Sequence, residues 1–361
     1  MTEPARRTLL LAATAAAGFG AAGLGGAGCT SDGGGEPGTT AGTAASTRRT
    51  PAHTPGSPGS GASSTPPAPP ATPTIPPEPP LPTASPWPLA RTEVEPLAKA
   101  SAVRLLEALG TWPRGQRGPG PARQRARAQD VPPARAAHLV SRAAPLLTPA
   151  PEATVRVIAA QYGGLAGDRA SVLVPLRQWR RAADGSVVDG GATVDVRLTR
   201  APSGWQVRDL LPSCPGRPLA RPGPLIRRTV THDRIHLPPA AEADVRAGHL
   251  RPAPLRALLT LAESYDIDVS VVRTGHPRNV FGTGRLSDHT RMRAFDVWAV
   301  NGRTVIDPTT PDALIDGFMR AAARAGAYRV GGPRLLGRGG GTYFSDRVHR
   351  DHLHIAFDSD E

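Results

Sequence analysis

Histidines and acidic residues gather near the C-terminal end of the sequence. Eight of the ten histidines lie in the stretch 232–354, which is well under half of the 361-residue chain. Imidazole and carboxylate groups hold divalent metal ions, and they also carry protons in hydrolytic reactions. The stretch LSDHTRMRAFD and the ending HRDHLHIAFD supply the candidates, which are His289, Asp296, Asp351, His352 and His354.

Strand periodicity predicts that most of these groups meet. In the expected strand 294–300, Asp296 lies on the face opposite to Phe295, and in the expected strand 352–357 both histidines lie opposite to the aliphatic residues. If these strands are neighbours in one sheet, Asp296 and both histidines lie on the same side of it, and His289 reaches them from the preceding loop. Two imidazoles and one carboxylate with an open fourth position are typical of a catalytic zinc site.

The neighbouring sequence predicts the elements that position these groups. The pattern PAPLRALLTLAESY indicates a helix over 252–265, IDVSVVRTG indicates a strand, and a second helix is expected over 311–325. Asn301-Gly302 favours a tight hairpin, because both residues readily take positive φ. The strand before this turn is therefore expected to pair antiparallel with 303–306.

The paired motif resembles a known family. The spacing His-x6-Asp within SDHTRMRAFD, followed by Asp-x-x-His in DHLHI, resembles the lysostaphin, D-Ala-D-Ala peptidase and Sonic hedgehog superfamily of zinc proteins, especially its D-Ala-D-Ala peptidase branch. The match covers about residues 250–361. The common pattern Ser-x-His-x-x-Gly-x-Ala-x-Asp is met except at the glycine, where this chain has Met292.

The resemblance implies roles for individual residues. It implies three ligands for Zn²⁺, which are His289, Asp296 and His354. Asp351 would take the proton of the attacking water and pass it to the leaving amine, and Arg273 would steady a substrate carboxylate or oxyanion. His352 would support a ligand or act as an acid. His276 and Ser287 flank the pocket loop, where they are structural residues or touch substrate.

The preceding segment, 87–215, is expected to form an antiparallel α+β unit. An amphipathic pattern predicts a helix from Val94 to Leu109, a second helix is expected near 134–146, and the turn residues at 201–204 separate two alternating strands. The segment loosely resembles nuclear-transport-factor-2-like domains, which are cone-shaped. No convergent set of histidines and carboxylates marks a site in it, so a spacer or a binding module is expected.

The small numbers of lysines and cysteines exclude several kinds of catalytic and metal site. Lys99 is the only lysine, and no serine precedes it by three residues, which excludes the Ser-x-x-Lys nucleophile and a phosphate-loop Gly-Lys pair. Two cysteines, Cys29 and Cys214, cannot build a zinc ribbon. Any metal must therefore be held by histidines and carboxylates.

The net charge of +13 belongs to the folded part of the chain. Basic residues outnumber acidic ones by 18 to 10 in 87–215 and by 21 to 16 in 216–361. Such a surface favours anionic partners. Six arginines in 114–135 are either a patch for wall phosphates or lipid headgroups, or a solvated loop. Nucleic acid is not expected as a partner, because interleaved aromatic residues are missing and the N-terminus resembles an export signal.

The N-terminus predicts export. Arg6-Arg7, an apolar run and small residues before Cys29 resemble a twin-arginine signal that ends at a lipid-attachment cysteine. Plain secretion and an uncleaved membrane-spanning helix are the alternatives, and all three place the rest of the chain outside the cytoplasmic membrane. Residues 30–86 contain 15 prolines and few large aliphatic side chains, so they are expected to be a disordered linker.

The sequence therefore predicts an α+β protein with two domains after a linker. The expected segments are a signal with a lipid-attachment cysteine at 1–29, the linker at 30–86, a nuclear-transport-factor-2-like domain at 87–215, and a small antiparallel-sheet zinc peptidase domain at 216–361. The expected function is a lipid-anchored zinc metallopeptidase, carboxypeptidase or endopeptidase, which faces the cell wall from the outer side of the cytoplasmic membrane. Its substrate would be peptidoglycan stem peptides, cut at D-alanine. The alternative is a catalytically inactive wall-binding lipoprotein with the same fold, and no oligomeric state follows from the sequence.

Overall fold

A computed structural model describes most of the C-terminal four-fifths of the chain. The described residues are 78, 80–337 and 341–359. The expected signal segment with Cys29, and the linker up to residue 77, lie outside them. The described chain is α+β, as expected, and its contacts group it into one compact unit. None of its helices is both long enough and apolar enough to span a bilayer.

The first half is a sheet with three helices against it. The five strands form an antiparallel sheet of order β1-β3-β4-β5, and β2 pairs with the same edge of β3 as β1 does, further along that strand. Residues 170–176 of β3 are all buried, as expected for a strand that is covered on both faces. The bounds are α1 Pro96–Gly110, α2 Pro119–Arg127, α3 Pro133–Arg142, β1 Ala153–Val157, β2 Gln161–Ala166, β3 Arg169–Arg181, β4 Val187–Ala201 and β5 Gly204–Pro212.

The second half contains a mixed sheet of order β11-β10-β12-β8-β7-β6, with β9 paired to β8. Its three central pairs and the β8-β9 hairpin are antiparallel, but β6 with β7 and β10 with β11 are parallel, which corrects the expectation of a purely antiparallel sheet. The bounds are α4 Pro224–Val230, β6 Ile235–His236, α5 Pro239–Arg246, α6 Pro252–Ala262, β7 Ile267–Val271, β8 Ala294–Val300, β9 Arg303–Thr304, α7 Asp312–Arg324, β10 Arg329–Gly331, β11 Tyr343–Phe344, the 3-10 helix η1 Val348–Arg350, and β12 Leu353–Ala356.

Local sequence signals predicted most of these elements. The helices expected from the apolar spacing are present as α1, α3, α6 and α7. Asn301 and Gly302 have φ values of 51° and 69° between β8 and β9, as the hairpin prediction requires. The prediction of a solvated loop for the arginine-rich stretch 114–135 is wrong in part, because residues 119–127 form α2. This helix buries only Ala122 and Ala126, and so narrow an apolar stripe gives little helical signal.

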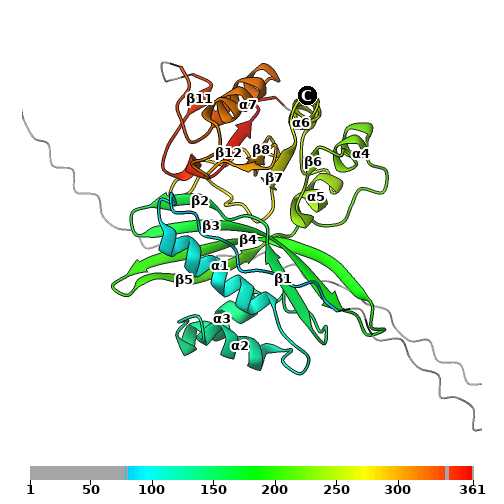
Figure 1. Ribbon diagram of the computed structural model, residues 1–361, viewed down its shortest axis with the longest axis vertical. Helices are drawn as coiled ribbons and strands as arrows, with labels where there is room; N and C mark the ends of the chain where they lie inside the picture. The colour runs from blue at the N-terminus through cyan, green and yellow to red at the C-terminus, as the bar shows by residue number, and fades with distance from the viewer. Residues whose placement is uncertain (1–77, 79, 338–340, 360–361) are drawn as a thin grey trace, which may run out of the picture. The chain divides into compact units, whose positions relative to one another are not determined.

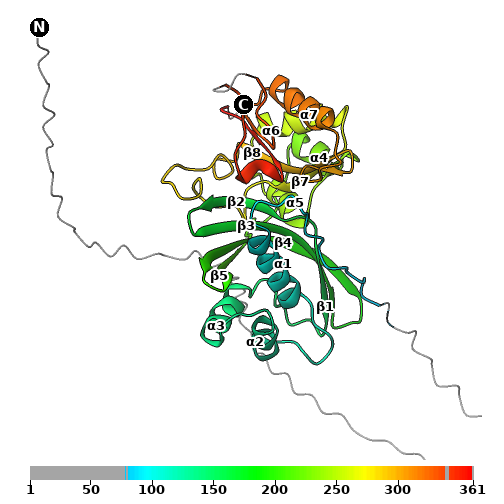
Figure 2. The same ribbon diagram turned by 60° about the vertical axis from the view of Figure 1, so that its left-hand side comes forward.

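Each half has its own hydrophobic core. Helices α1, α2 and α3 lie on one side of the first sheet, and the elements of the second half lie on its other side (Figures 1 and 2). Strand β2 borders the second half, where it contacts η1. The end of the first sheet therefore lies beside the segment that carries Asp351, His352 and His354. The expected boundary between domains at 215 and 216 stays a prediction.

Candidate metal centre

Two central strands of the second sheet bring the candidate ligands together. β12 pairs antiparallel with β8, and His354 lies directly opposite Asp296 in this pair. Residues that are directly opposite in an antiparallel pair project from the same face of the sheet. The strands are thus neighbours, as the interpretation by strand periodicity required. His289 lies in the irregular stretch between β7 and β8.

Three ligand atoms form a small triangle at this point. The distance from His289 Nε2 to Asp296 Oδ1 is 3.1 Å, from His289 Nε2 to His354 Nδ1 3.2 Å, and from His354 Nδ1 to Asp296 Oδ1 3.0 Å. In a tetrahedral zinc site with bonds of about 2.0–2.1 Å, ligand atoms are about 3.3 Å apart. The three residues that the sequence motif singled out therefore have the spacing of metal ligands.

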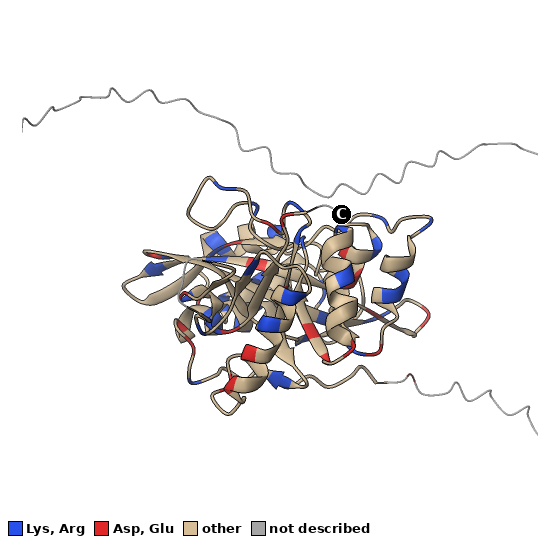
Figure 3. Cartoon of the chain, turned by 90° about the horizontal axis from the view of Figure 1, so that it is seen from above, with Lys and Arg blue, Asp and Glu red and all other residues tan. Residues whose placement is uncertain are grey.

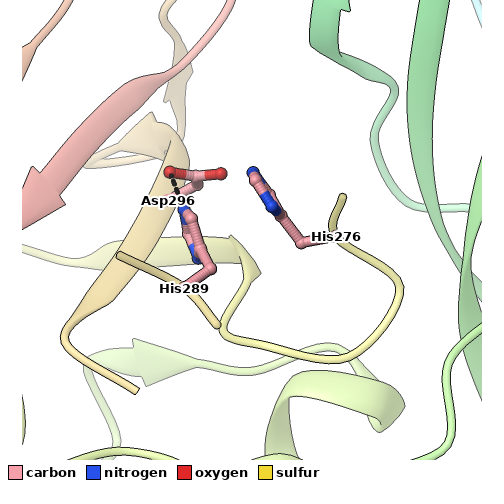
Figure 4. A group of neighbouring side chains, drawn as sticks. All are labelled: His276, His289 and Asp296. Atoms are coloured by element: carbon pink, nitrogen blue, oxygen red, sulfur yellow. Dashed lines mark hydrogen bonds and ion pairs between the residues drawn. The ribbon is translucent and has the colours of Figure 1, made fainter. Parts of the chain in front are cut away.

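His276 adds a third imidazole to the group. One ligand atom each from His276, His289 and Asp296 lie within 4.8 Å of one another, so these residues could hold a metal ion (Figure 4). The rings of His276 and His289 are stacked, with centroids 4.1 Å apart. Sequence reasoning assigned no ligand role to His276, because this residue follows β7 in an irregular loop where no periodicity orients the side chain.

Backbone carbonyls fix the protonation of two rings. His289 Nδ1 lies 2.6 Å from the carbonyl oxygen of Val272, and His276 Nδ1 lies 2.9 Å from that of Pro277. Since a carbonyl oxygen only accepts, Nδ1 carries a proton in both rings, and Nε2 is left for a ligand bond. The Nε2 atom of His289 then faces His354 Nδ1 and a carboxylate oxygen, an arrangement of lone pairs that a cation satisfies.

The electrostatics favour the ligand forms of Asp296, His276 and His354, but not that of His289, whose pKa is raised. Burial opposes the ionisation of Asp296, but the imidazoles of His289 and His352 outweigh it and hold the pKa of Asp296 well below its ordinary value. Burial lowers the pKa of His354 to about 4 and that of His276 well below its ordinary value. For His289, Asp296 outweighs burial and raises the pKa. An ionised carboxylate and neutral imidazoles are the states that metal binding requires.

The first half of the chain holds one of these ligands in place. Gln161, the first residue of β2, donates from Nε2 to Asp296 Oδ2 over 2.6 Å. Its own Oε1 accepts a hydrogen bond from Ser270 of β7. All three side chains are buried. Sequence reasoning missed Gln161, because nothing in the local pattern of β2 indicates a partner that lies 135 residues away.

A buried lysine from α1 reaches the opposite end of the site. Lys99 Nζ lies 2.5 Å from Glu93 Oε2 and 2.7 Å from Asp351 Oδ2, and these side chains are at most 1 % exposed. The ring of Tyr162 lies 4.5 Å from Nζ, and the Tyr162 N–H donates to Asp351 Oδ2. Sequence reasoning used Lys99 only to exclude a Ser-x-x-Lys nucleophile and a phosphate-loop Gly-Lys pair. Its position four residues before the buried Val103 was the available signal that it lies on the inner face of α1.

Asp351 and His352 form a buried pair. Asp351 Oδ1 accepts from His352 Nδ1 over 2.6 Å, while its Oδ2 is taken by Lys99 and Tyr162. Burial opposes the ionisation of Asp351, but Lys99 outweighs it and lowers the pKa. The structure therefore places the Asp351 carboxylate behind His352, and the imidazole of His352 faces the neighbourhood of Asp296, whose charge raises the His352 pKa against the effect of burial.

A cavity of about 490 Å³ opens beside the ligand group. It is lined by the glycines of β2, by three candidate ligands and by His352, together with the guanidinium-bearing Arg285 and Arg329. Neither Asp351 nor Arg273 is among its lining residues. The backbone N–H of Arg273 donates to Asp244 Oδ2 over 3.0 Å. The cavity thus has arginines of its own, which the sequence motif did not indicate.

Met292 occupies a left-handed turn rather than the cavity wall. Its φ is 64°, its N–H donates to the His289 carbonyl, and the next N–H, of Arg293, donates to the Asp288 carbonyl. These two bonds define a Schellman turn, whose left-handed position favours glycine. The departure from the family pattern therefore acts on the backbone, and Met292 does not line the cavity.

Replacing Met292 with glycine is expected to raise the free energy of unfolding by about 0.5–1 kcal/mol, because a side chain at positive φ is strained. Urea unfolding measures this change, and the metal content should stay as in the wild type. Arg291→Gly is the matched control, since it adds a glycine where no positive φ requires one. A Met292→Gly protein that is less stable than the wild type would show that the backbone at Met292 is not strained.

The group His276, His289 and Asp296 could hold a metal ion, and His354 lies within 3.2 Å of two of its members. Supporting contacts come from both halves of the described chain. Comparison with protein-family models, with curated proteins and with solved structures found no match for this chain.

Proposed function

We propose that the chain is a zinc-dependent peptidase that hydrolyses peptide bonds of peptidoglycan stem peptides, at D-alanine. The observation that supports it most is the triangle of His289 Nε2, Asp296 Oδ1 and His354 Nδ1, with sides of 3.0–3.2 Å, at the wall of a cavity. A donor set of imidazoles and one carboxylate at tetrahedral spacing favours zinc. The substrate class comes from the D-Ala-D-Ala peptidase resemblance of the motif.

The side chains around the ligand group have distinct parts in this proposal. When bound, Zn²⁺ supplies Lewis-acid chemistry, which lowers the pKa of water towards about 7 and polarises a carbonyl oxygen. His352 takes the water proton and passes it to the leaving amine, because its imidazole borders the cavity. Asp351 orients His352 through Nδ1, and Lys99 fixes Asp351. Arg285 and Arg329 hold a substrate carboxylate.

This division of labour revises the part that the motif implied for Asp351. The motif implies that Asp351 carries the proton itself. Both of its oxygens already accept hydrogen bonds, and its pKa is lowered by Lys99 after burial is overcome. A carboxylate with a depressed pKa is a weak base. The contacts therefore favour His352 as the proton carrier, with Asp351 as its positioning residue.

The proposal includes fold and location. The segment 87–215 would be a nuclear-transport-factor-2-like domain, and 216–361 would be a peptidase domain of the D-Ala-D-Ala peptidase type. The chain would be exported and lipid-anchored through Cys29 on the outer face of the cytoplasmic membrane. That location gives a wall-directed peptidase access to its substrate.

One observation favours the second candidate, a non-catalytic wall-binding lipoprotein. His276 lies close enough to His289 and Asp296 to complete a metal site. Four protein ligands close a zinc site and make it structural, whereas three leave a position for substrate. The two functions therefore differ in whether His276 is a ligand.

Purified protein should contain about one zinc per chain by elemental analysis, and His289→Ala should lose it together with all activity. Incubation with purified sacculi, read by the masses of the released fragments, tests the peptidase and separates carboxypeptidase from endopeptidase. His276→Ala should keep zinc and turnover if three ligands suffice. Zinc loss in His276→Ala, with intact sacculi in the wild type, would support the wall-binding protein. A metal-free wild type would contradict both.

A further inference from the structure

A second hollow, of about 390 Å³, lies next to the candidate metal centre. Val280 and Phe281 line both the hollow and the larger cavity, so the two are separated by a single loop. Three arginines line the hollow, and they come from three different elements or loops: Arg169 from β3, Arg197 from β4 and Arg278 from the loop. No acidic residue is among its lining residues.

Strand register places two of these arginines on one face of the first sheet. Arg197 lies opposite Ser171, and Arg169 is two residues from Ser171 along β3. The two arginines are therefore diagonal neighbours that project from the same face. Arg197 is held rigidly, because Nε and Nη2 donate to the buried carboxylate of Asp195 over 2.6–2.8 Å. The Phe281 ring lies 5.2 Å from its guanidinium carbon.

The loop that carries Arg278 is itself ordered by backbone bonds. The Val280 N–H donates to Arg285 O over 2.8 Å, and the Ser287 N–H donates to Arg278 O over 3.1 Å. The loop is fitted against β2, since a Cβ on Gly164 would overlap the Phe281 side chain. The backbone of the loop and its packing against β2 are therefore fixed, whereas the side chains of Arg169 and Arg278 are exposed at the hollow.

The charge in the hollow is not balanced by the chain. Asp195 compensates Arg197, but within the described residues neither Arg169 nor Arg278 has an ion-pair partner. Elsewhere, basic and acidic residues are intermingled over the described chain (Figure 3). Guanidinium groups bind carboxylates through paired, charge-assisted hydrogen bonds. A hollow with two uncompensated guanidiniums therefore suits an anionic group of a ligand.

We propose that this hollow is a subsite for a side-chain carboxylate of the peptide substrate, and that it makes the enzyme select acidic peptides. The inference rests on the proposed peptidase function, since it takes the larger cavity as the place of the bond to be cut. A peptide in that cavity reaches the hollow across Val280 and Phe281. The acidic residue that is recognised would then flank the cut bond rather than belong to it.

The test uses two fluorescent peptides that end in D-Ala-D-Ala and differ only in one flanking residue, glutamate or glutamine. Their binding to the His289→Ala protein is measured by anisotropy, so this readout needs no hydrolysis. The glutamate peptide is expected to bind at least about 10-fold more tightly. Arg169→Ala/Arg278→Ala should remove this preference. Arg256→Ala/Arg324→Ala, which removes two exposed charges on α6 and α7, should keep it.

Two results would overturn the subsite: equal binding of both peptides to the His289→Ala protein, or an unchanged preference after loss of Arg169 and Arg278. The peptidase function is tested separately by hydrolysis of the same peptides by the wild type. Hydrolysis without any preference would contradict the subsite alone. A preference that depends on the two arginines, without hydrolysis by the wild type, would contradict the peptidase and support the anionic subsite.

Discussion

Lys99→Met is expected to lower the free energy of unfolding by about 3–5 kcal/mol. Lys99 is the shared partner of Glu93 and Asp351, and all three side chains are at most 1 % exposed. Removal of one member of a buried ion pair leaves the other charge without compensation, which costs about this much. Here two carboxylates are left, although burial raises the pKa of Glu93 and so eases its protonation. Urea unfolding followed by circular dichroism measures the change.

Arg104→Met on the same helix is the matched control for this substitution. Arg104 is exposed, so its loss should change stability by no more than about 0.5 kcal/mol. Lys99→Met/Glu93→Gln should regain part of the lost stability, because one of the two orphaned charges is then neutral. A Lys99→Met protein as stable as Arg104→Met would show that the buried network carries little energy.

The faces of the two strands at the candidate metal centre were predictable, because the alternation in β8 and β12 determines which side chains lie on the same side of each strand. That the strands are neighbours was a condition of the prediction, and the structure meets it. His354 and Asp296 are opposite each other in consequence. Fold class and the principal helices follow from similarly local signals. The sheet edges were not predictable, because β6 and β11 are two-residue strands whose direction depends on tertiary packing.

The contacts from the first half were not predictable from local patterns. Gln161 and Lys99 meet partners that are 135 and 252 residues away. No periodicity names a partner across such distances, and an isolated glutamine in a strand is usually a surface residue. The expectation of a spacer or binding module for 87–215 therefore did not include the contacts of Gln161 and Lys99 with the candidate site. With Gln161 on Asp296 and Lys99 on Asp351, this segment supports the candidate site directly.

His352→Gln is expected to lower kcat by about 10²–10⁴-fold while the zinc content stays unchanged. His352 borders the cavity, and its Nδ1 is fixed by Asp351 over 2.6 Å, so Nε2 is the atom left to exchange a proton with water or the leaving amine. Loss of a general acid or base typically costs this factor. Turnover of a D-Ala-terminated peptide measures kcat, and elemental analysis measures zinc.

His349→Gln is the matched control, because His349 lines the same cavity, with its ring 5.0 Å from that of His352, but pairs with Asp346 instead. It should change kcat by less than His352→Gln does. Asp351→Asn separates the two assignments of the proton. If His352→Gln turns over at the wild-type rate and Asp351→Asn does not, Asp351 carries the proton, as the motif implies. If His352→Gln is nearly inactive, whether Asp351→Asn is also inactive or not, the imidazole of His352 is required. Asp351 then acts by positioning this imidazole.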